Sequence, residues 1–134
     1  MSDFNTRIME EFRQNQGRVA GPFEGASLVL LTTTGARSGE PRTNPLVSLE
    51  EDGHLYVFAS YAGAPTNPAW YHNLVANPVV GVEQGDDRFE ATAVPVNGTR
   101  RDEIYARQAE RMPGFAEYQE KTDRVIPVVE LVRT

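Results

Sequence analysis

The sequence predicts an α+β fold in which six mostly antiparallel strands close into a small barrel with flanking helices. Six segments are rich in β-branched and apolar residues, and most are joined by short turns containing Gly, Asp or Asn, as hairpins require. Closing such a sheet into a barrel removes its exposed edges. The 134 residues suit a single domain, with a helix in residues 1–17 and the barrel in residues 27–134.

An amphipathic helix is expected over residues 2–16. Ser2 or Asp3 can cap its start, and Gly17 can end it before a loop at residues 21–25. Packing over the barrel is the favoured interpretation, because Arg7 and Arg13 are too few basic residues for a membrane-surface helix. The apolar face consists of Phe4, Ile8, Met9 and Phe12.

The first three strands are expected at residues 27–34, 41–50 and 54–61. The first is almost continuously apolar, which predicts a strand buried on both faces. Residues 51–53 read Glu-Asp-Gly, and an Asp-Gly pair supplies the positive φ that a tight hairpin turn needs. The third segment alternates between two sets of side chains, as a strand does.

The rest of the chain predicts three helices and three strands. Asn67 is expected to cap a helix with Pro68 at its first position, and Asn77-Pro78 stops it. Thr99 is expected to cap the next helix. Pro127 implies that the last strand lies at an edge or starts there. The expected helices are residues 69–75, 99–111 and 115–121, and the expected strands are residues 79–83, 88–96 and 125–132.

Composition excludes several classes of function. The net charge is −6, whereas a nucleic-acid or anionic-membrane partner requires a basic face. The chain has no Cys, which rules out disulfides and a thiol nucleophile, and His54 and His72 are too few for a metal centre. No segment resembles a signal peptide or a membrane span. A cytoplasmic location is therefore expected, with peripheral membrane contact left open.

Residues 28–46 predict two strands around a loop that binds an anion. The basic loop, residues 34–39, has two glycines that let its N–H groups approach a ligand. Arg37 and Arg42, with the hydroxyls of Ser38 and Thr43, would form a cradle for a phosphate or a carboxylate. The alternative is a solvated hairpin tip with two surface arginines. The glycine spacing matches neither a Walker motif nor a dinucleotide fingerprint.

Residues 67–73 predict a wall for a broad, flat ring. Trp70, Tyr71 and His72 fall in the first turns of a helix directly after a strand, and such a helix start attracts anions and polar carbonyls. Burial of Trp70 and Leu74 in the core is equally compatible with their spacing. His72 is assigned no catalytic role, because a lone histidine is most often structural.

Aromatic residues gather again near the C-terminus. Tyr105, Met112, Phe115 and Tyr118 would line a pocket for an apolar substrate, or would pack helices on the barrel. Asp123-Arg124 is expected to form a local ion pair of little energetic weight. No pair of acids and no Ser-His-Asp pattern has a spacing that demands catalysis.

These stretches resemble the deazaflavin (coenzyme F420)-dependent nitroreductase and quinone reductase family, a split β-barrel group. The matching segments are LTTTGARSGEPRTNPL, FASYAGAPTNPAWYHNLVANP and YQEKTDRVIPVVEL, and the similarity runs from Leu28 to Leu131. The resemblance implies a six-stranded split β-barrel related to flavin-binding barrels. It implies that reduced coenzyme F420 donates a hydride to a quinone-like or other electrophilic acceptor, with nitro compounds left open, in a monomer or a homodimer.

The resemblance also assigns site residues. The phosphate and oligoglutamate tail of the cofactor would lie along the basic loop, and Tyr118 and Ser60 would orient or protonate the substrate. The tail would be held by Arg37, Ser38 and Arg42, with support from Thr43, Asn44 and Pro45. The deazaflavin ring would be surrounded by Phe58, Ala59, Ser60, Tyr61, Ala69, Trp70, Tyr71 and Asn73.

The chain departs from the family pattern at several positions. Phe115 and Met112 stand where a nitroimidazole-reducing member has tyrosines, which removes phenol donors and argues against nitroimidazole activation. Ala36 precedes Arg37 where relatives can carry two adjacent basic residues, and Tyr61 stands where relatives show a lysine. Two alternatives remain: flavin mononucleotide as the cofactor, and a deazaflavin carrier without catalysis.

Overall fold

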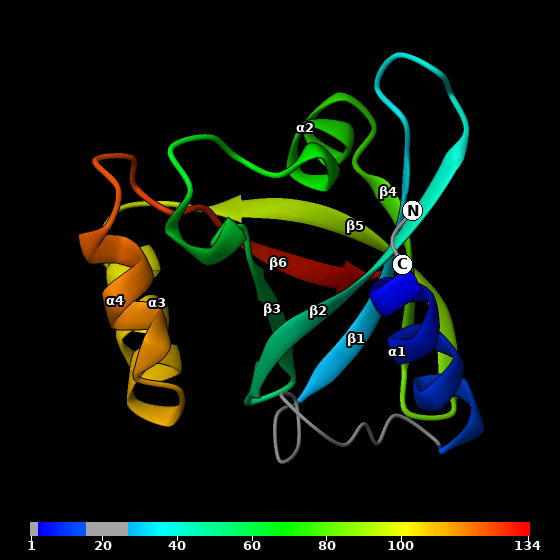
Figure 1. Ribbon diagram of the computed structural model, residues 1–134, viewed down its shortest axis with the longest axis horizontal. Coiled ribbons are helices and arrows are strands. Elements are labelled where there is room, and N and C mark those ends of the chain that lie inside the picture. The colour runs from blue at the N-terminus through cyan, green and yellow to red at the C-terminus, as the bar shows by residue number, and fades with distance from the viewer. Residues whose placement is uncertain (1–2, 16–26) are drawn as a thin grey trace.

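The computed structural model describes residues 3–15 and 27–134. Within these residues the chain forms six strands and four α-helices. In chain order the elements are α1 (Asp3–Gln14), β1 (Leu28–Thr34), β2 (Pro41–Glu51), β3 (His54–Phe58), the 3₁₀ turn η2 (Tyr61–Gly63), α2 (Ala69–Ala76), β4 (Val79–Gln84), β5 (Asp87–Val96), α3 (Gly98–Arg111), α4 (Gly114–Glu120) and β6 (Val128–Arg133). The strands close into an antiparallel barrel in the order β1-β2-β3-β6-β5-β4, which confirms the predicted fold class. In Figure 1, α3 and α4 lie together on one side, and α2 lies beside the β1–β2 loop.

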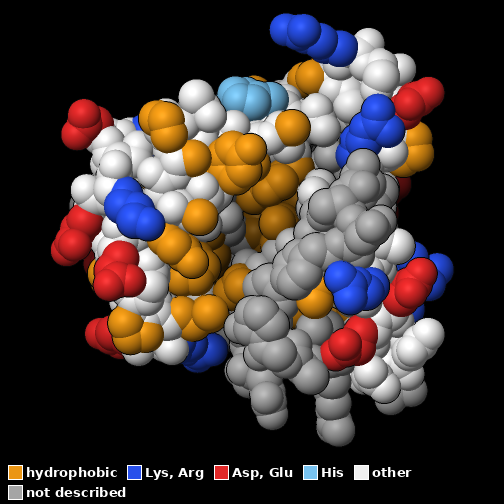
Figure 2. Space-filling model, in the orientation of Figure 1, with side chains coloured by type: hydrophobic (Ala, Val, Ile, Leu, Met, Phe, Trp, Pro, Cys, Tyr) orange, Lys and Arg blue, Asp and Glu red, His pale blue; other side chains and the backbone are white. Residues whose placement is uncertain are grey.

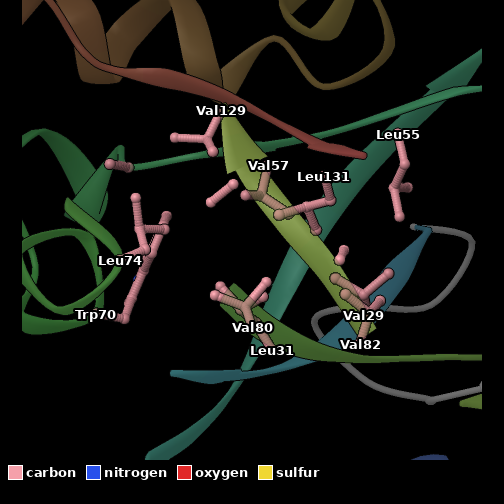
Figure 3. Close-up of a cluster of buried hydrophobic side chains, with 13 residues drawn as sticks. Val29, Leu31, Leu55, Val57, Trp70, Leu74, Val80, Val82, Val129 and Leu131 are labelled. Carbon is pink, nitrogen blue, oxygen red and sulfur yellow. The ribbon is translucent and has the colours of Figure 1, made fainter. Parts of the chain in front are cut away.

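Alternate side chains of the strands fill the barrel interior, as the period of two along a strand requires. β1 contributes Val29 and Leu31, both fully buried. α2 closes one end, where Trp70 and Leu74 point from the helix into the same cluster (Figure 3). The other members of the cluster are Leu55, Val57, Ala59, Val80, Val82, Ala91, Ala93, Val129 and Leu131.

The N-terminal helix packs over the barrel, as predicted. Leu28 and Leu30, on the outer face of β1, form a second cluster with side chains of α1. This contact explains why β1 is apolar on both faces. In the described residues no helix is long and apolar enough to cross a membrane. The buried side chains of α1 are Ile8, Met9 and Phe12. Asp3 is the first residue of α1, and the helix ends at Gln14 rather than at Gln16. The predicted cap at Ser2, Gly17 and the loop at residues 21–25 lie outside what the structure describes, and a single domain over residues 1–134 stays a prediction.

The third strand is shorter than predicted. β3 ends at Phe58, although the alternating pattern continues to Tyr61. After Ser60 the chain turns, because Tyr61 and Ala62 have positive φ angles of 47° and 53° and enter η2. Two backbone hydrogen bonds close the turn, from the N–H of Gly63 to the carbonyl of Ser60 and from the N–H of Ala64 to the carbonyl of Tyr61. Arg124, far along the chain, adds side-chain hydrogen bonds to the carbonyls of Ala59 and Ser60, and the local pattern carries no sign of these.

Two predicted helix caps are wrong. Pro68 is the residue that precedes α2, and the side chain of Asn67 accepts a hydrogen bond from Arg124 Nη1 at 2.9 Å instead of capping the helix. Asn97 precedes α3, so Thr99 lies inside the first turn. Local sequence favours both predicted caps, but a distant guanidinium takes the oxygen of Asn67. Pro127 directly precedes β6, as expected for a strand start.

An ion pair between α1 and β4 makes part of the stability pH-dependent. Arg13 donates to both carboxylate oxygens of Glu83, from Nε to Oε1 at 3.1 Å and from Nη2 to Oε2 at 3.0 Å. The hydrogen bond from Arg13 is the main reason why the pKa of Glu83 is lowered. A lowered pKa in the folded state means that this stabilisation is complete at neutral pH and is lost as the pH falls through the lowered value.

Glu83→Gln is expected to lower the free energy of unfolding by up to about 1 kcal/mol near neutral pH, and by less near about pH 3. Urea denaturation at both pH values measures the difference. Arg88→Gln is the matched control, because Arg88 contacts the same carboxylate at 3.4 Å but is 73% exposed. A loss in the control as large as that in Glu83→Gln would contradict the role given to Arg13.

Candidate functional site

A polar cavity of about 850 Å³ lies between the basic loop, the start of β2 and α2. Arg37, Ser38 and Arg42 line it, as the cradle prediction requires. Trp70 and Asn73 line it from the helix side. The remaining lining residues are Gly35, Ala36, Thr43, Asn44, Ala69 and His72, so no carboxylate is among the described residues that line this cavity.

The basic loop is folded tightly on itself. The N–H of Gly35 donates to the carbonyl of Glu40 at 2.8 Å, and the N–H of Gly39 donates to the carbonyl of Gly35 at 2.9 Å. Ser38 Oγ accepts from the N–H of Glu40 at 3.2 Å. A Cβ at Gly35 would lie 2.4 Å from Ser38 Oγ, so a larger residue there would require the side chain of Ser38 to move out of its bond with Glu40. The loop therefore presents a defined surface to the cavity.

Asn73 fastens the basic loop to α2. Its Oδ1 accepts from the N–H of Ala36 at 3.0 Å, and its Nδ2 donates to Thr33 Oγ1 at 3.2 Å. Asn77 adds a donor to the carbonyl of Thr34 at 3.4 Å. The side chain of Asn73 was expected beside the ring. It instead holds the basic loop to α2 at the edge of the polar cavity.

The charges of the polar cavity fit a polyanionic tail. Arg37 is exposed, and within the described residues it has neither an ion pair nor a hydrogen bond. Arg42 contacts the carboxylate of Glu40 at 3.6 Å, and the two side chains are 57% and 67% exposed. An ion pair that is this exposed is weak, so an anionic ligand can replace Glu40 as the partner of Arg42. Two available guanidinium groups, in a cavity whose described lining has no carboxylate, suit a ligand that carries phosphate and carboxylate groups, as the predicted tail does.

An apolar cavity of about 590 Å³ adjoins the polar one at Trp70, which lines both. Pro45 continues the wall from the neighbouring Asn44 of the polar cavity. Figure 2 shows apolar side chains gathered in a hollow on this face, with basic side chains over the β1–β2 loop at the upper right. The lining residues are Pro45, Leu46, Val47, Phe58, Ser60, Tyr61, Ala62, Pro68, Trp70, Met112, Phe115 and Tyr118.

Aromatic contacts make one wall of the apolar cavity rigid. The ring of Phe115 lies edge-on to Phe58 and Tyr118, with centroid distances of 5.7 and 5.4 Å. The hydroxyl of Tyr105 donates to the carbonyl of Phe115 at 2.6 Å. Burial raises the pKa of Tyr105 to about 12, so this phenol stays protonated and keeps the bond. The aromatic cluster therefore both packs the helices and lines the pocket.

Two of the predicted ring contacts fall elsewhere. Tyr71 lines a third cavity of about 410 Å³, together with Asn97 and Arg101, because neighbouring residues on a helix point about 100° apart. Ala59 is fully buried in the barrel core, since it follows Phe58 and points to the opposite face. The other predicted residues line one of the two adjoining cavities.

The structure adds residues that the sequence did not single out for this site. Leu46, Val47 and Pro68 line the apolar cavity, and the exposed His72 lines the polar one. Arg124 was expected to pair with Asp123. Its guanidinium instead donates to backbone carbonyls beside the apolar cavity, and carbonyl acceptors leave no pattern in a sequence.

Comparisons with known proteins identify the family to which the chain belongs. The sequence model of the F420H(2)-dependent quinone reductase family matches residues 5–133. An F420H(2)-dependent quinone reductase of Mycobacterium tuberculosis is 39% identical over 128 residues, covering 91% of this chain and 85% of that protein. A solved F420-H2-dependent reductase is 44% identical with a TM-score of 0.72, over 78% of this chain and 93% of that one. A solved chain described as a domain-swapped dimer is 41% identical with a TM-score of 0.73, over 94% and 96%.

The family description confirms the predicted family, an F420-dependent quinone reductase as the class of enzyme, and coenzyme F420 as the cofactor. Flavin mononucleotide, the alternative cofactor, receives no support from it. The match extends over nearly the whole chain, including the basic loop and both cavities. The chain therefore belongs to the F420H(2)-dependent quinone reductase family.

Proposed function

We propose that this protein binds reduced coenzyme F420 and transfers a hydride from it to a quinone-like acceptor. The observation that carries the proposal is the junction, at Trp70, of a basic polar cavity with an apolar one. The polar cavity suits a long anionic tail, and the apolar cavity suits a flat ring with an apolar acceptor against it. Relatives named F420H(2)-dependent quinone reductases support the same cofactor and class of acceptor.

The side chains divide the work between the two cavities. Arg37 and Arg42 hold the tail through charge-assisted hydrogen bonds and so direct the ring end past Trp70 into the apolar cavity. Reduced F420 supplies the hydride when it is bound. The apolar walls, among them Leu46 and Phe115, exclude water from the reacting atoms. No nucleophile is required.

Tyr118 and Ser60 are proposed to orient or protonate the acceptor, because each brings a hydroxyl to the lining of the apolar cavity. Tyr118→Phe and Ser60→Ala are expected to lower kcat by roughly tenfold or more. Affinity for F420 is expected to change much less in these variants. Tyr71→Phe is the matched control, since it also loses a phenol but lines the third cavity. Stopped-flow kinetics and a cofactor titration separate the two effects, and an unchanged kcat in both variants would remove these residues from the mechanism.

The proposed reaction is tested by mixing the protein with reduced F420 and menadione. Return of the absorbance of oxidised F420 only when menadione and protein are both present is the expected result. Binding without turnover over a panel of quinones and nitro compounds would instead make the protein a deazaflavin carrier. Tighter binding of flavin mononucleotide than of F420 would replace the cofactor. Nitroimidazoles are expected to react poorly, because Phe115 and Met112 offer no phenol.

The assembly and the location stay proposals. A relative described as a domain-swapped dimer supports a homodimer, and a monomer is the alternative. Light scattering of the purified protein decides between them. We also propose a cytoplasmic location with peripheral membrane contact as an open possibility, which cell fractionation tests.

A further inference from the structure

Arg124 is a partly buried arginine that binds backbone carbonyls rather than carboxylates. Its Nε donates to the carbonyl of Ala64 at 2.8 Å. Nη1 donates to the carbonyl of Ala59 and to Oδ1 of Asn67, both at 2.9 Å, and Nη2 donates to the carbonyl of Ser60 at 2.6 Å. All four acceptors belong to one segment, residues 59–67, which joins β3 to α2. A guanidinium is suited to this task because it presents several donors in a fixed plane.

The segment that Arg124 binds has a strained backbone. Tyr61 and Ala62 are non-glycine residues in the left-handed region, and Gly63 follows with a φ of 79°. Such a conformation persists only where surrounding contacts hold it, and it is often found at functional sites. On its far side the segment is confined by α4, because a Cβ at Gly63 would lie 2.8 Å from the carbonyl oxygen of Tyr118. Arg124 supplies the contacts on the near side.

The hydrogen bonds of the guanidinium also fix the orientation of two peptide groups in this segment. The carbonyls of Ala59 and Ser60 point at Arg124. In a planar trans peptide the next N–H points the opposite way, so the N–H groups of Ser60 and Tyr61 point away from Arg124. Within the described residues neither N–H has a hydrogen-bond partner. Ser60 and Tyr61 line the apolar cavity together with Ala62.

The charge of Arg124 is not neutralised by a neighbour. Among the described residues no carboxylate forms an ion pair with it, although Asp123 is adjacent in sequence. Desolvation by burial lowers the pKa of Arg124. Holding one loop for stability alone would not require a cation, since a neutral amide also donates hydrogen bonds. A cation binds carbonyl oxygens more strongly than a neutral donor does. Arg124 can therefore hold the backbone of residues 59–67 in one conformation, as a cavity wall of fixed shape requires.

We infer that Arg124 is a positioning residue of the apolar cavity, which holds residues 59–67 in the conformation that forms the wall against the cofactor ring. The inference rests on the proposed function. It predicts that Arg124 governs binding of the ring, whereas Arg37 and Arg42 govern binding of the tail. The two roles are separable because the ring and the tail can be offered in different molecules.

The test uses Arg124→Met and Arg124→Lys in the full chain, each titrated with F420 and with the deazaflavin that lacks the phosphate and glutamate tail. Arg124→Met is expected to weaken both ligands to a similar extent, by at least about tenfold, as for the loss of charge-assisted hydrogen bonds. The absorption band of the bound ring is expected to move toward its position in water. Arg124→Lys, which keeps the charge but not the fork of donors, is expected to recover only part of both effects.

Arg100→Met is the matched control, because it removes a guanidinium that is 54% exposed and binds Tyr56 and Glu130 outside both cavities. Circular dichroism verifies that each variant is folded at the temperature of the titration, and Arg124→Lys carries the test where Arg124→Met is not folded. Wild-type affinity and band position in a folded Arg124 variant would overturn the inference. So would an effect limited to F420 with its tail. If the wild type binds neither ligand, the proposed function itself fails, which is a different result.

Discussion

Replacing Arg37 and Arg42 together by alanine is expected to weaken F420 binding by about 100-fold or more. Each charge-assisted contact contributes about 1.5–3 kcal/mol, and both residues line the polar cavity, whose described lining contains no carboxylate. Each single variant is expected to lose part of this. The loss is expected to be larger at low salt than at high salt, because mobile ions screen exposed charges. Fluorescence titration of F420 at two salt concentrations measures it.

Three controls test whether the loss of affinity comes from contacts of Arg37 and Arg42 with the tail. The deazaflavin without the tail is expected to bind the double variant almost normally, because the two arginines are proposed to contact only the tail. Arg88→Ala removes the same charge on the β4–β5 hairpin, at the end of β1 opposite to the basic loop, and is expected to have little effect. Glu40→Gln is expected to tighten binding, since it releases Arg42 from its weak ion pair. Equal affinity of all variants would show that the tail does not lie in this cavity.

Trp70→Ala is expected to lower the free energy of unfolding by about 3–5 kcal/mol and to abolish stable binding of the ring. Trp70 is only 7% exposed and fills the end of the barrel, yet it also lines both cavities. Truncation therefore leaves a hole in the core and removes the wall at which the cavities join. Urea denaturation followed by circular dichroism is the measurement, because the variant loses the sole tryptophan of the chain.

Leu74→Ala separates the two roles of this helix. Leu74 lies in the same core cluster, is 1% exposed and lines neither cavity. It is expected to cost about 2–5 kcal/mol in stability while the folded fraction still binds F420. Trp70→Phe is expected to keep much of the stability and to change the affinity for the ring. Normal affinity in Trp70→Phe would show that Trp70 belongs to the core alone.

The helix α2 shows which roles of its side chains the sequence can predict. The spacing of Trp70 and Leu74 was compatible with either role, and the structure gives Trp70 both. The sequence places Tyr71 beside Trp70 at the predicted ring, yet Tyr71 lines the third cavity. Adjacent positions on a helix do not share a face, and only the orientation of the helix on the barrel shows which of them lines the two adjoining cavities.

The sequence by itself determined the features that local chemistry controls. Alternating and continuous apolar patterns predicted the strands, Asp52-Gly53 predicted the hairpin turn, and the glycines around Arg37 predicted the basic loop. Only the tertiary structure decided where β3 ends, what Asn67 binds, and which residues form the walls of the apolar cavity. These features depend on contacts between segments far apart in the chain, among them the hydrogen bonds of Arg124 to backbone carbonyls of residues 59–64. Every residue type has a carbonyl, so such contacts leave no trace in the order of side chains.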